Sequence, residues 1–162
     1  LKELLPVEKF GYDAIFFILL ILCFAWGGDT CAYFAGRAFG KHKLCPVVSP
    51  KKTVEGAVGG VLGTMVFGVL VTVIYSIAAD RMEEFTRSNI GVSMYIIIAL
   101  LACVAAVLGI YGGLFASVVK RQCGIKDYGT IFPGHGGILD RFDSVMFIAP
   151  FVTMVVIAAF YD

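Results

Sequence analysis

Long apolar runs dominate this sequence and limit the folds that are open to it. They cover residues 13–39, 53–79, 92–119 and 143–161, and a helix needs roughly 20 apolar residues to cross a bilayer. Of the 162 residues, 59% are hydrophobic and 15% are charged, whereas a soluble domain carries roughly 25% charged residues. The sequence therefore predicts an all-α integral membrane protein with about four transmembrane helices.

The charges of the connections predict how these helices are oriented. Basic residues gather in the first and third connections: Lys41, Lys43, Lys51 and Lys52 in the first, and Lys120, Arg121, Lys126 and Arg141 in the third. The second connection, residues 80–88, mixes acidic and basic residues. Positively charged connections stay on the cytoplasmic side of a membrane. We therefore expect two cytoplasmic motif-bearing loops and external termini.

The segment 117–143 contains more charged and glycine residues than a simple connection between helices needs. It contains the cations Lys120, Arg121, Lys126 and Arg141, the carboxylates Asp127, Asp140 and Asp143, and the glycines Gly134, Gly136 and Gly137. Carboxylates are hard ligands for divalent cations, and glycine lets the backbone approach a ligand closely. This inventory suits a metal-bound phosphate, as in phosphoryl or nucleotidyl transfer.

Two features of this segment leave alternatives open. His135 is flanked by glycines, so it has no helix face to pack against, and it could donate to a phosphate, transfer a proton or fold the loop. Asp140 and Asp143 are three residues apart and lie on one side if the segment is helical. Arg141 between them could neutralise either carboxylate, which would make them structural partners instead of ligands.

Asp29 interrupts the first apolar run. A carboxylate at membrane depth is costly and usually faces the interior of a helix bundle or a water-filled cavity, so it is a candidate for function. Helical spacing places it on one stripe with Tyr33 and with Gly36 or Arg37. The alternative is that Asp29 pairs with Arg37 or lies at a solvated helix end.

The stretch SPKKTVEG, residues 49–56, predicts the start of the second long helix. Ser49 is a good N-cap and Pro50 a good first helical residue, which places Lys51 and Lys52 in the first turn. Backbone N–H groups are free at that point, so two cations there favour an anion-binding site. The alternative is a cytoplasmic helix end that contacts lipid headgroups.

Small residues and cysteines have structural interpretations. Glycine or alanine recurs at helical spacing in the second and third runs: Gly56, Gly59, Gly60, Gly63 and Gly68, then Ala102, Ala106, Gly109, Gly113 and Ala116. Such spacing lets membrane helices pack closely. None of the five cysteines forms a C-x-x-C pair, so we expect reduced cysteines and neither a zinc site nor a disulfide framework.

Three stretches together resemble the phosphatidate cytidylyltransferase family. They are D-x-x-A-Y-x-x-G-R-x-x-G from Asp29, S-P-K-K-T-x-E-G from Ser49, and S-x-x-K-R-x(4)-K-D-x-G-x(3)-P-G-H-G-G-x-x-D-R-x-D from Ser117. The resemblance covers most of residues 29–143 and matches the carboxyl-terminal, catalytic part of that family. It implies a single transmembrane catalytic domain over residues 1–162, as the carboxyl-terminal part of a longer chain. It also implies a location in the bacterial inner membrane, with the active-site loops in the cytoplasm.

The resemblance implies transfer of CMP from CTP to phosphatidic acid, which gives CDP-diacylglycerol and pyrophosphate. The lipid phosphate would attack the α-phosphorus of CTP, and Mg²⁺, with a possible second cation, would stabilise the developing charge. The implied catalytic residues are Asp140, Lys126, Asp127, His135 and Arg141, and the implied metal ligands are Asp140 and Asp143. The implied substrate-binding residues are Asp29, Ser49, Lys51, Lys52, Ser117, Lys120, Arg121, Gly134, Gly136 and Gly137. The expected partners are CTP, phosphatidic acid, the lipid bilayer and a second copy in a homodimer, with no nucleic acid.

The chain departs from the family at one point. The family usually reads G-D-L-x-E-S where residues 112–117 read GGLFAS, so Gly113 stands for an expected aspartate and Ala116 for an expected glutamate. In the family, that aspartate shares the metal centre with the residue that matches Asp140. Loss of a carboxylate ligand should weaken Mg²⁺ binding. The departure predicts either an impaired enzyme or a metal site that differs from the family pattern.

Three other functions are compatible with parts of the sequence. The chain could be a non-catalytic homologue that binds only lipid or nucleotide, and Mg²⁺-dependent CTP turnover would distinguish it. A CTP-dependent polyprenol kinase-like enzyme would differ in its lipid acceptor. A transporter with a polar site at the membrane midplane would suit Asp29, but transport predicts similar polar features on both sides, and residues 80–88 contain no glycine or histidine cluster.

Overall fold

The computed structural model describes residues 13–81, 92–125, 128–129, 137 and 139–160. The helices are α2 (Asp13–Leu22), the π-helical turn η1 (Cys23–Gly27), α3 (Gly28–Phe39), α4 (Val54–Arg81), α5 (Val92–Gln122) and α6 (Leu139–Phe160). Two short strands, β1 (Lys43–Cys45) and β2 (Ser49–Thr53), join α3 to α4. The prediction of an all-α membrane protein is confirmed.

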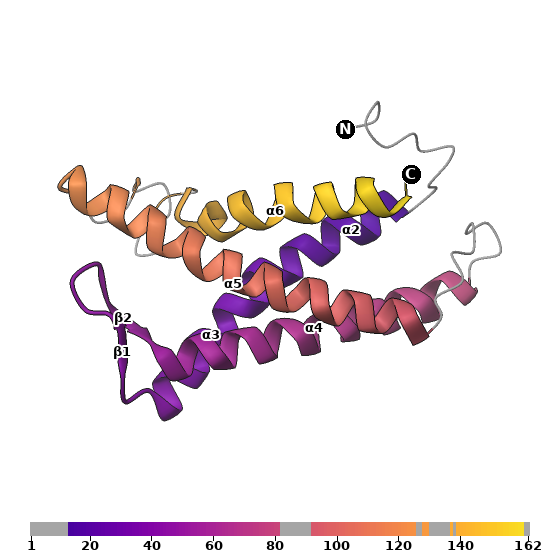
Figure 1. Cartoon of the computed structure of the whole chain (residues 1–162), viewed down its shortest axis with the longest axis horizontal. Helices are drawn as coiled ribbons and strands as arrows, with labels where there is room; N and C mark the ends of the chain where they lie inside the picture. The colour runs from indigo at the N-terminus through magenta and orange to yellow at the C-terminus, as the bar shows by residue number, and fades with distance from the viewer. Residues whose placement is uncertain (1–12, 82–91, 126–127, 130–136, 138, 161–162) are drawn as a thin grey trace.

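The helices form a bundle whose neighbours follow the chain order. Helix α3 packs on α4, α4 packs on α5, and α5 packs on α6, while α2 contacts α6 and closes the bundle. Figure 1 shows the β1–β2 hairpin, the end of α5 and the start of α6 at one end of the molecule. The hairpin and the described ends of the α5–α6 connection therefore lie at the same end of the molecule.

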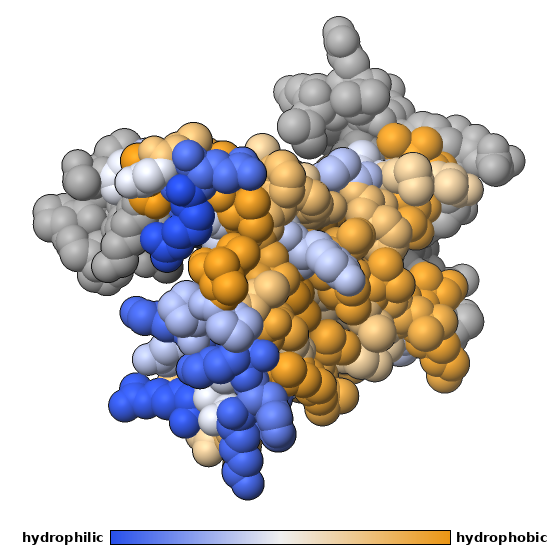
Figure 2. Space-filling model, turned by 60° about the vertical axis from the view of Figure 1, so that its left-hand side comes forward, coloured by the Kyte–Doolittle hydropathy of each residue, from blue (hydrophilic) through white to orange (hydrophobic). Residues whose placement is uncertain are grey.

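Three described segments are long and apolar enough to cross a membrane: Ala14–Phe39, Val54–Ala78 and Tyr95–Gln122. The fourth predicted span corresponds to α6, whose apolar part, Phe142–Ala158, is shorter. The outward faces of the helices carry exposed aliphatic and aromatic side chains such as Leu62, Val66 and Leu100. In Figure 2 hydrophobic surface covers these helices, and hydrophilic side chains gather at the hairpin end.

The core lies where the first helix meets α5 and α6. Its fully buried side chains include Leu20, Phe24, Ile98, Ile148 and Val152, each 2% exposed or less. Around them, the small residues of α5 are buried, as their spacing predicted. Close packing of this kind depends on dispersion contacts, since lipid provides little hydrophobic drive between membrane helices.

The glycines of α4 let α3 approach closely. A Cβ on Gly59 would collide with the Cβ of Ala35, and a Cβ on Gly60 would lie 3.0 Å from the Cβ of Ala32. At Gly63 the obstacle would be Cys31. The prediction that these small residues serve helix packing is confirmed.

The π-helical turn η1 lies directly before Asp29. Helices α2, η1 and α3 follow without a break, because Leu22 and Gly28 both keep right-handed helical dihedrals, with φ of −64° and −60°. Such turns carry an extra residue and are frequent at functional sites. After this turn, Asp29 lies on the side of α3 that faces Ser144 of α6.

The start of α4 differs from the prediction. Ser49 and Pro50 belong to β2, which pairs antiparallel with β1 through Lys43↔Thr53 and Cys45↔Ser49. The helix begins at Val54, and the hydroxyl of Thr53 accepts the backbone N–H of Gly56 at 3.1 Å. The expectation that Ser49 caps the helix was therefore wrong: Thr53 provides the cap, and proline is compatible with a strand at the edge of a sheet.

Candidate functional site

A cleft of about 650 Å³ opens between the hairpin, α3, α5 and the start of α6. Its cationic lining residues are Arg37, Lys43, Lys51 and Lys52, and its acidic ones are Asp29, Asp140 and Asp143. Lys51 is exposed and Lys52 is half-buried. Lys51 and Lys52 of the first predicted loop and Asp140 of the second thus line one cavity, whereas the predicted residue His135 lies outside the described residues.

A side-chain contact between His42 and Glu55 and three backbone hydrogen bonds hold the hairpin against α4. Nδ1 of His42 lies 2.6 Å from Oε1 of Glu55. The backbone N–H of His42 donates to both carboxylate oxygens of Glu55, at 3.1 and 3.2 Å, and the N–H of Val54 donates to the His42 carbonyl at 2.9 Å. Glu55 thus fixes the hairpin that carries the lysines of the cleft. Sequence reasoning passed over both residues because they lie 13 positions apart.

Asp140 organises the ends of the α5–α6 connection. Its Oδ1 lies 2.7 Å from Nζ of Lys120, and its Oδ2 accepts the backbone N–H groups of Tyr128 and Gly137 at 2.9 and 3.0 Å. Burial alone would raise the pKa of Asp140, but the bonds from Lys120 and the two N–H groups outweigh it and lower the pKa. Within the described residues, the partner of Asp140 is Lys120 rather than Arg141, whose side chain is not described.

Tyr128 contacts the surroundings of Asp140 through its backbone N–H, its ring and its hydroxyl. Its backbone N–H reaches Asp140, its ring lies 5.3 Å from Nζ of Lys120, and its hydroxyl donates to the carbonyl of Ala116 at 3.1 Å. The ring–ammonium contact is favourable because a cation is attracted to the face of an aromatic ring. This role of Tyr128 is a finding of the structure.

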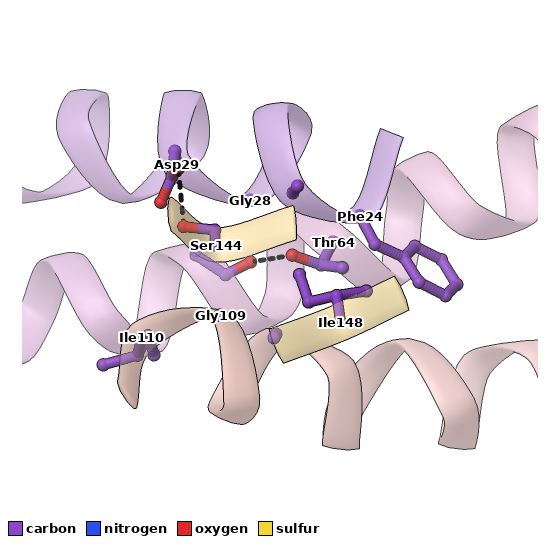
Figure 3. A pocket seen from close by; sticks show the side chains of 11 residues that line it. Phe24, Gly28, Asp29, Thr64, Gly109, Ile110, Ser144 and Ile148 are labelled. Carbon is purple, nitrogen blue, oxygen red and sulfur yellow. Dashed lines mark hydrogen bonds between the residues drawn. The ribbon is translucent and has the colours of Figure 1, made fainter. Parts of the chain in front are cut away.

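A second polar cluster joins α3 to α6. The hydroxyl of Ser144, a side chain only 3% exposed, lies 3.1 Å from Oδ2 of Asp29 and 3.4 Å from Oδ1 of Asp143. The backbone N–H of Ser144 donates to the same Asp143 oxygen at 2.7 Å. Figure 3 shows Asp29 and Ser144 pointing toward one another across a small cavity that Thr64 and Ile148 also line. No local pattern could reveal Ser144, because Asp29 is 115 residues away.

Lys52 occupies the space above Gly113. Its Nζ lies 2.5 Å from the point that a Cβ on Gly113 would occupy, and Oδ2 of Asp143 lies 3.9 Å from that point. Burial lowers the pKa of Lys52, and the nearby carboxylates of Asp29 and Asp143 only partly offset this. The position where an aspartate was expected therefore faces an ammonium group.

The other predicted residues have varied surroundings. Ser117 donates its hydroxyl to the Gly113 carbonyl at 2.7 Å, within the same helix. Arg121 is exposed in the last turn of α5, Ser49 is half-buried on β2, and Gly137 is buried. The predicted residues that lie outside the described part are Lys126, Asp127, Gly134, His135 and Gly136.

The described residues do not form a complete metal centre. Among them, no group of three or more histidine, cysteine, aspartate or glutamate side chains lies close enough to hold a metal ion. Both oxygens of Asp140 already accept hydrogen bonds, and Gly113 and Ala116 offer no carboxylate. A divalent cation held by Asp140 and Asp143 stays a prediction.

The fold and the site define a class of protein: a helical membrane bundle with a charged cleft at one end. The chain belongs to the cytidylyltransferase family, whose model matches residues 3–159. It is 38% identical over 145 residues to phosphatidate cytidylyltransferase of Staphylococcus haemolyticus, which covers 90% of this chain and 50% of that protein. The Bacillus subtilis enzyme of the same name is 36% identical over 150 residues, 93% of this chain and 49% of that one.

A third relative matches this chain to a similar extent. Phosphatidate cytidylyltransferase of Staphylococcus saprophyticus is 40% identical over 145 residues, again 90% of this chain and 50% of the relative. The chain thus spans about half the length of the curated relatives it matches. These matches confirm the family that the three motifs indicated.

Proposed function

We propose that this chain is the part of a phosphatidate cytidylyltransferase that transfers CMP from CTP to phosphatidic acid. The observation that carries the proposal is the cleft, in which cations from the hairpin and α3 face carboxylates of α6 at one end of a membrane bundle. Family membership supports it. The positive-inside rule places the cleft on the cytoplasmic side, where CTP is available.

The triphosphate of CTP fits the cationic side of the cleft. Arg37 comes from α3, and Lys43 and Lys51 come from the hairpin, so a polyphosphate between them meets positive charge from two elements. Charge-assisted hydrogen bonds from such groups are the strong contacts that phosphates make in proteins. Lys43 was first noted only as a loop charge and Arg37 only as a possible neighbour of Asp29, and both line the cleft.

Phosphatidic acid fits the membrane side of the same cleft. Tyr33 lines the cleft and is 60% exposed, and its neighbour Phe34 is 62% exposed, so an aromatic surface continues from the cleft toward the bilayer. Trp26 and Phe142 form an edge-to-face pair at 6.0 Å that links the first helix to α6. We place the acyl chains along this surface and the lipid phosphate inside the cleft.

The reaction itself is a displacement at phosphorus. An oxygen of the lipid phosphate forms a bond to the α-phosphorus of CTP, the bond from that phosphorus to the β-phosphate oxygen breaks, and pyrophosphate leaves. The residues of this chain orient the two anions and neutralise their charge. Mg²⁺ is proposed to arrive bound to the triphosphate, as its substrate complex.

The test is incorporation of labelled CTP into lipid by the purified protein, with and without Mg²⁺. We expect CDP-diacylglycerol from phosphatidic acid and no product from a polyprenol acceptor. Product from the polyprenol alone would identify a different lipid-modifying activity. Binding of CTP without turnover in either lipid would identify a non-catalytic homologue and overturn the proposal.

A further inference from the structure

Two carboxylates share one hydroxyl beside the cleft. The hydroxyl of Ser144 lies within hydrogen-bond distance of both Asp29 and Asp143. A hydroxyl has a single proton to donate, so it serves one of these carboxylates at a time. Two carboxylates that share one hydroxyl repel one another, and a nearby cation relieves this repulsion.

Lys52 brings that cation to the cluster. Nζ of Lys52 and Oδ2 of Asp143 lie 2.5 and 3.9 Å from one point, the position of a Cβ on Gly113, and Asp29 lines the same cleft. Gly113 makes the room, because a Cβ there would lie 2.5 Å from Nζ of Lys52, closer than non-bonded atoms approach. The position of Lys52 is fixed by the antiparallel pairing of β2 with β1 and by the start of α4 at Val54.

We propose that Lys52 is the resident cation of this cluster: its ammonium neutralises Asp29 and Asp143 in the place where a protein-held divalent cation would otherwise bind. On this proposal, glycine at position 113 leaves the space that the Lys52 ammonium needs. A divalent cation binds between Asp29 and Asp143 only when the ammonium is absent. This inference concerns the cleft of the proposed function, yet it involves neither CTP nor lipid, so either proposal can fail while the other stands.

Manganese binding tests the inference directly. The purified protein would be titrated with Mn²⁺, and free Mn²⁺ followed by electron paramagnetic resonance. We expect Lys52→Met to bind Mn²⁺ at least about tenfold more tightly than the wild type, a change of about 1.4 kcal/mol. Lys41→Met, which removes an exposed lysine just before β1, should match the wild type. Adding Asp143→Asn to Lys52→Met should abolish the gain. Equal Mn²⁺ affinity in Lys52→Met and the wild type would overturn the proposal.

A second measurement decides the question if Lys52→Met does not fold. Each lysine of the wild type and of Asp143→Asn would be acetylated under limiting reagent, and the extent at each position read by mass spectrometry. Lys52 is half-buried whereas Lys41 is exposed, so Lys52 should react more slowly in the wild type. Asp143→Asn should accelerate acetylation of Lys52 and leave Lys41 unchanged. An unchanged rate at Lys52 would show that Asp143 does not hold the ammonium.

Discussion

Lys120 and Asp140 form an ion pair, with 2.7 Å between Nζ and Oδ1, that joins the last turn of α5 to the first turn of α6. Both side chains are largely shielded, at 13% and 12% exposure. Removing one partner of a shielded pair leaves the other charge uncompensated, and this costs more than the intact pair contributes. The pair therefore fixes the two ends of the α5–α6 connection.

Lys120→Met should destabilise the fold. The variant keeps the length of the side chain but removes the cation beside Asp140, whose remaining partners among the described residues are the N–H groups of Tyr128 and Gly137. We expect a loss on the order of 1–3 kcal/mol in the free energy of unfolding, measured as a lower Tm in detergent. Arg121→Met is the control, because Arg121 is the exposed neighbour on the same turn. If both variants melt at the same temperature, the ion pair has no structural role.

Acid should weaken the same contact. The pKa of Asp140 lies below its usual value: burial opposes ionisation, but Lys120 and two backbone N–H groups favour it more. The stabilisation is therefore complete above the unfolded-state pKa of about 3.9 and is lost as the pH falls through the lower folded-state pKa. The stability difference between the wild type and Asp140→Asn should shrink as the pH falls through this window. A difference that stays constant with pH would contradict this.

The membrane fold could be predicted because its signal is local. An apolar run of helix length indicates a span wherever its neighbours lie, and small residues at helical spacing indicated the close approach of α3 and α4. The β1–β2 hairpin was not predicted, because its formation depends on pairing between residues that are distant in the sequence. Strand pairing of Lys43 with Thr53 spans ten positions, and the capping preference of Ser49 could not be weighed against that of Thr53 from sequence alone.

The site was predicted in its composition but not in its pairing. Lys120 and Asp140 were chosen as ligands for phosphate and metal, and the structure joins them to each other. Ser144 was missed because its importance comes from Asp29, on a different helix. The role of Lys52 depends on the absence of a side chain at Gly113, because its Nζ lies 2.5 Å from the point that a Cβ there would occupy. These three features depend on contacts between residues far apart in the sequence, which local sequence patterns do not reveal.

Glu55 should position the lysines of the hairpin. Its two carboxylate oxygens receive the backbone and ring N–H groups of His42. Glu55→Gln keeps the shape but replaces one acceptor oxygen with a donor, so the hairpin should detach more often from α4. We expect faster hydrogen exchange of the amides of residues 43–53 and a raised KM for CTP with a smaller change in kcat. Glu55→Asp, which keeps both oxygens, should restore part of the protection, and unchanged exchange in Glu55→Gln would rule out this role.

Gly113→Asp should fold, whereas Gly112→Asp should not fold well. A Cβ on Gly113 meets the end of the flexible Lys52 side chain, which can move aside. Replacing a helical glycine also removes up to about 1 kcal/mol of helix penalty. A Cβ on Gly112 would lie 2.8 Å from the Phe147 ring and 3.0 Å from the Asp143 carbonyl oxygen, so it would push α5 away from α6. Thermal unfolding should show a lower Tm for Gly112→Asp alone. Similar losses in both variants would mean that position 113 is packed as tightly as position 112.

Combining Gly113→Asp with Lys52→Met should give the largest gain in divalent-cation binding. In Gly113→Asp alone the new carboxylate pairs with the Lys52 ammonium, so Mn²⁺ affinity should change little. In the double variant, the new carboxylate, Asp29 and Asp143 all lack a cation, and such residues in contact show effects that do not add. The double variant should therefore bind Mn²⁺ more tightly than the sum of the single changes predicts. The Mg²⁺-dependent CTP turnover of the double variant indicates whether a divalent cation bound by these carboxylates supports the reaction. A folded double variant that binds Mn²⁺ no better than Lys52→Met would show that position 113 does not face the site.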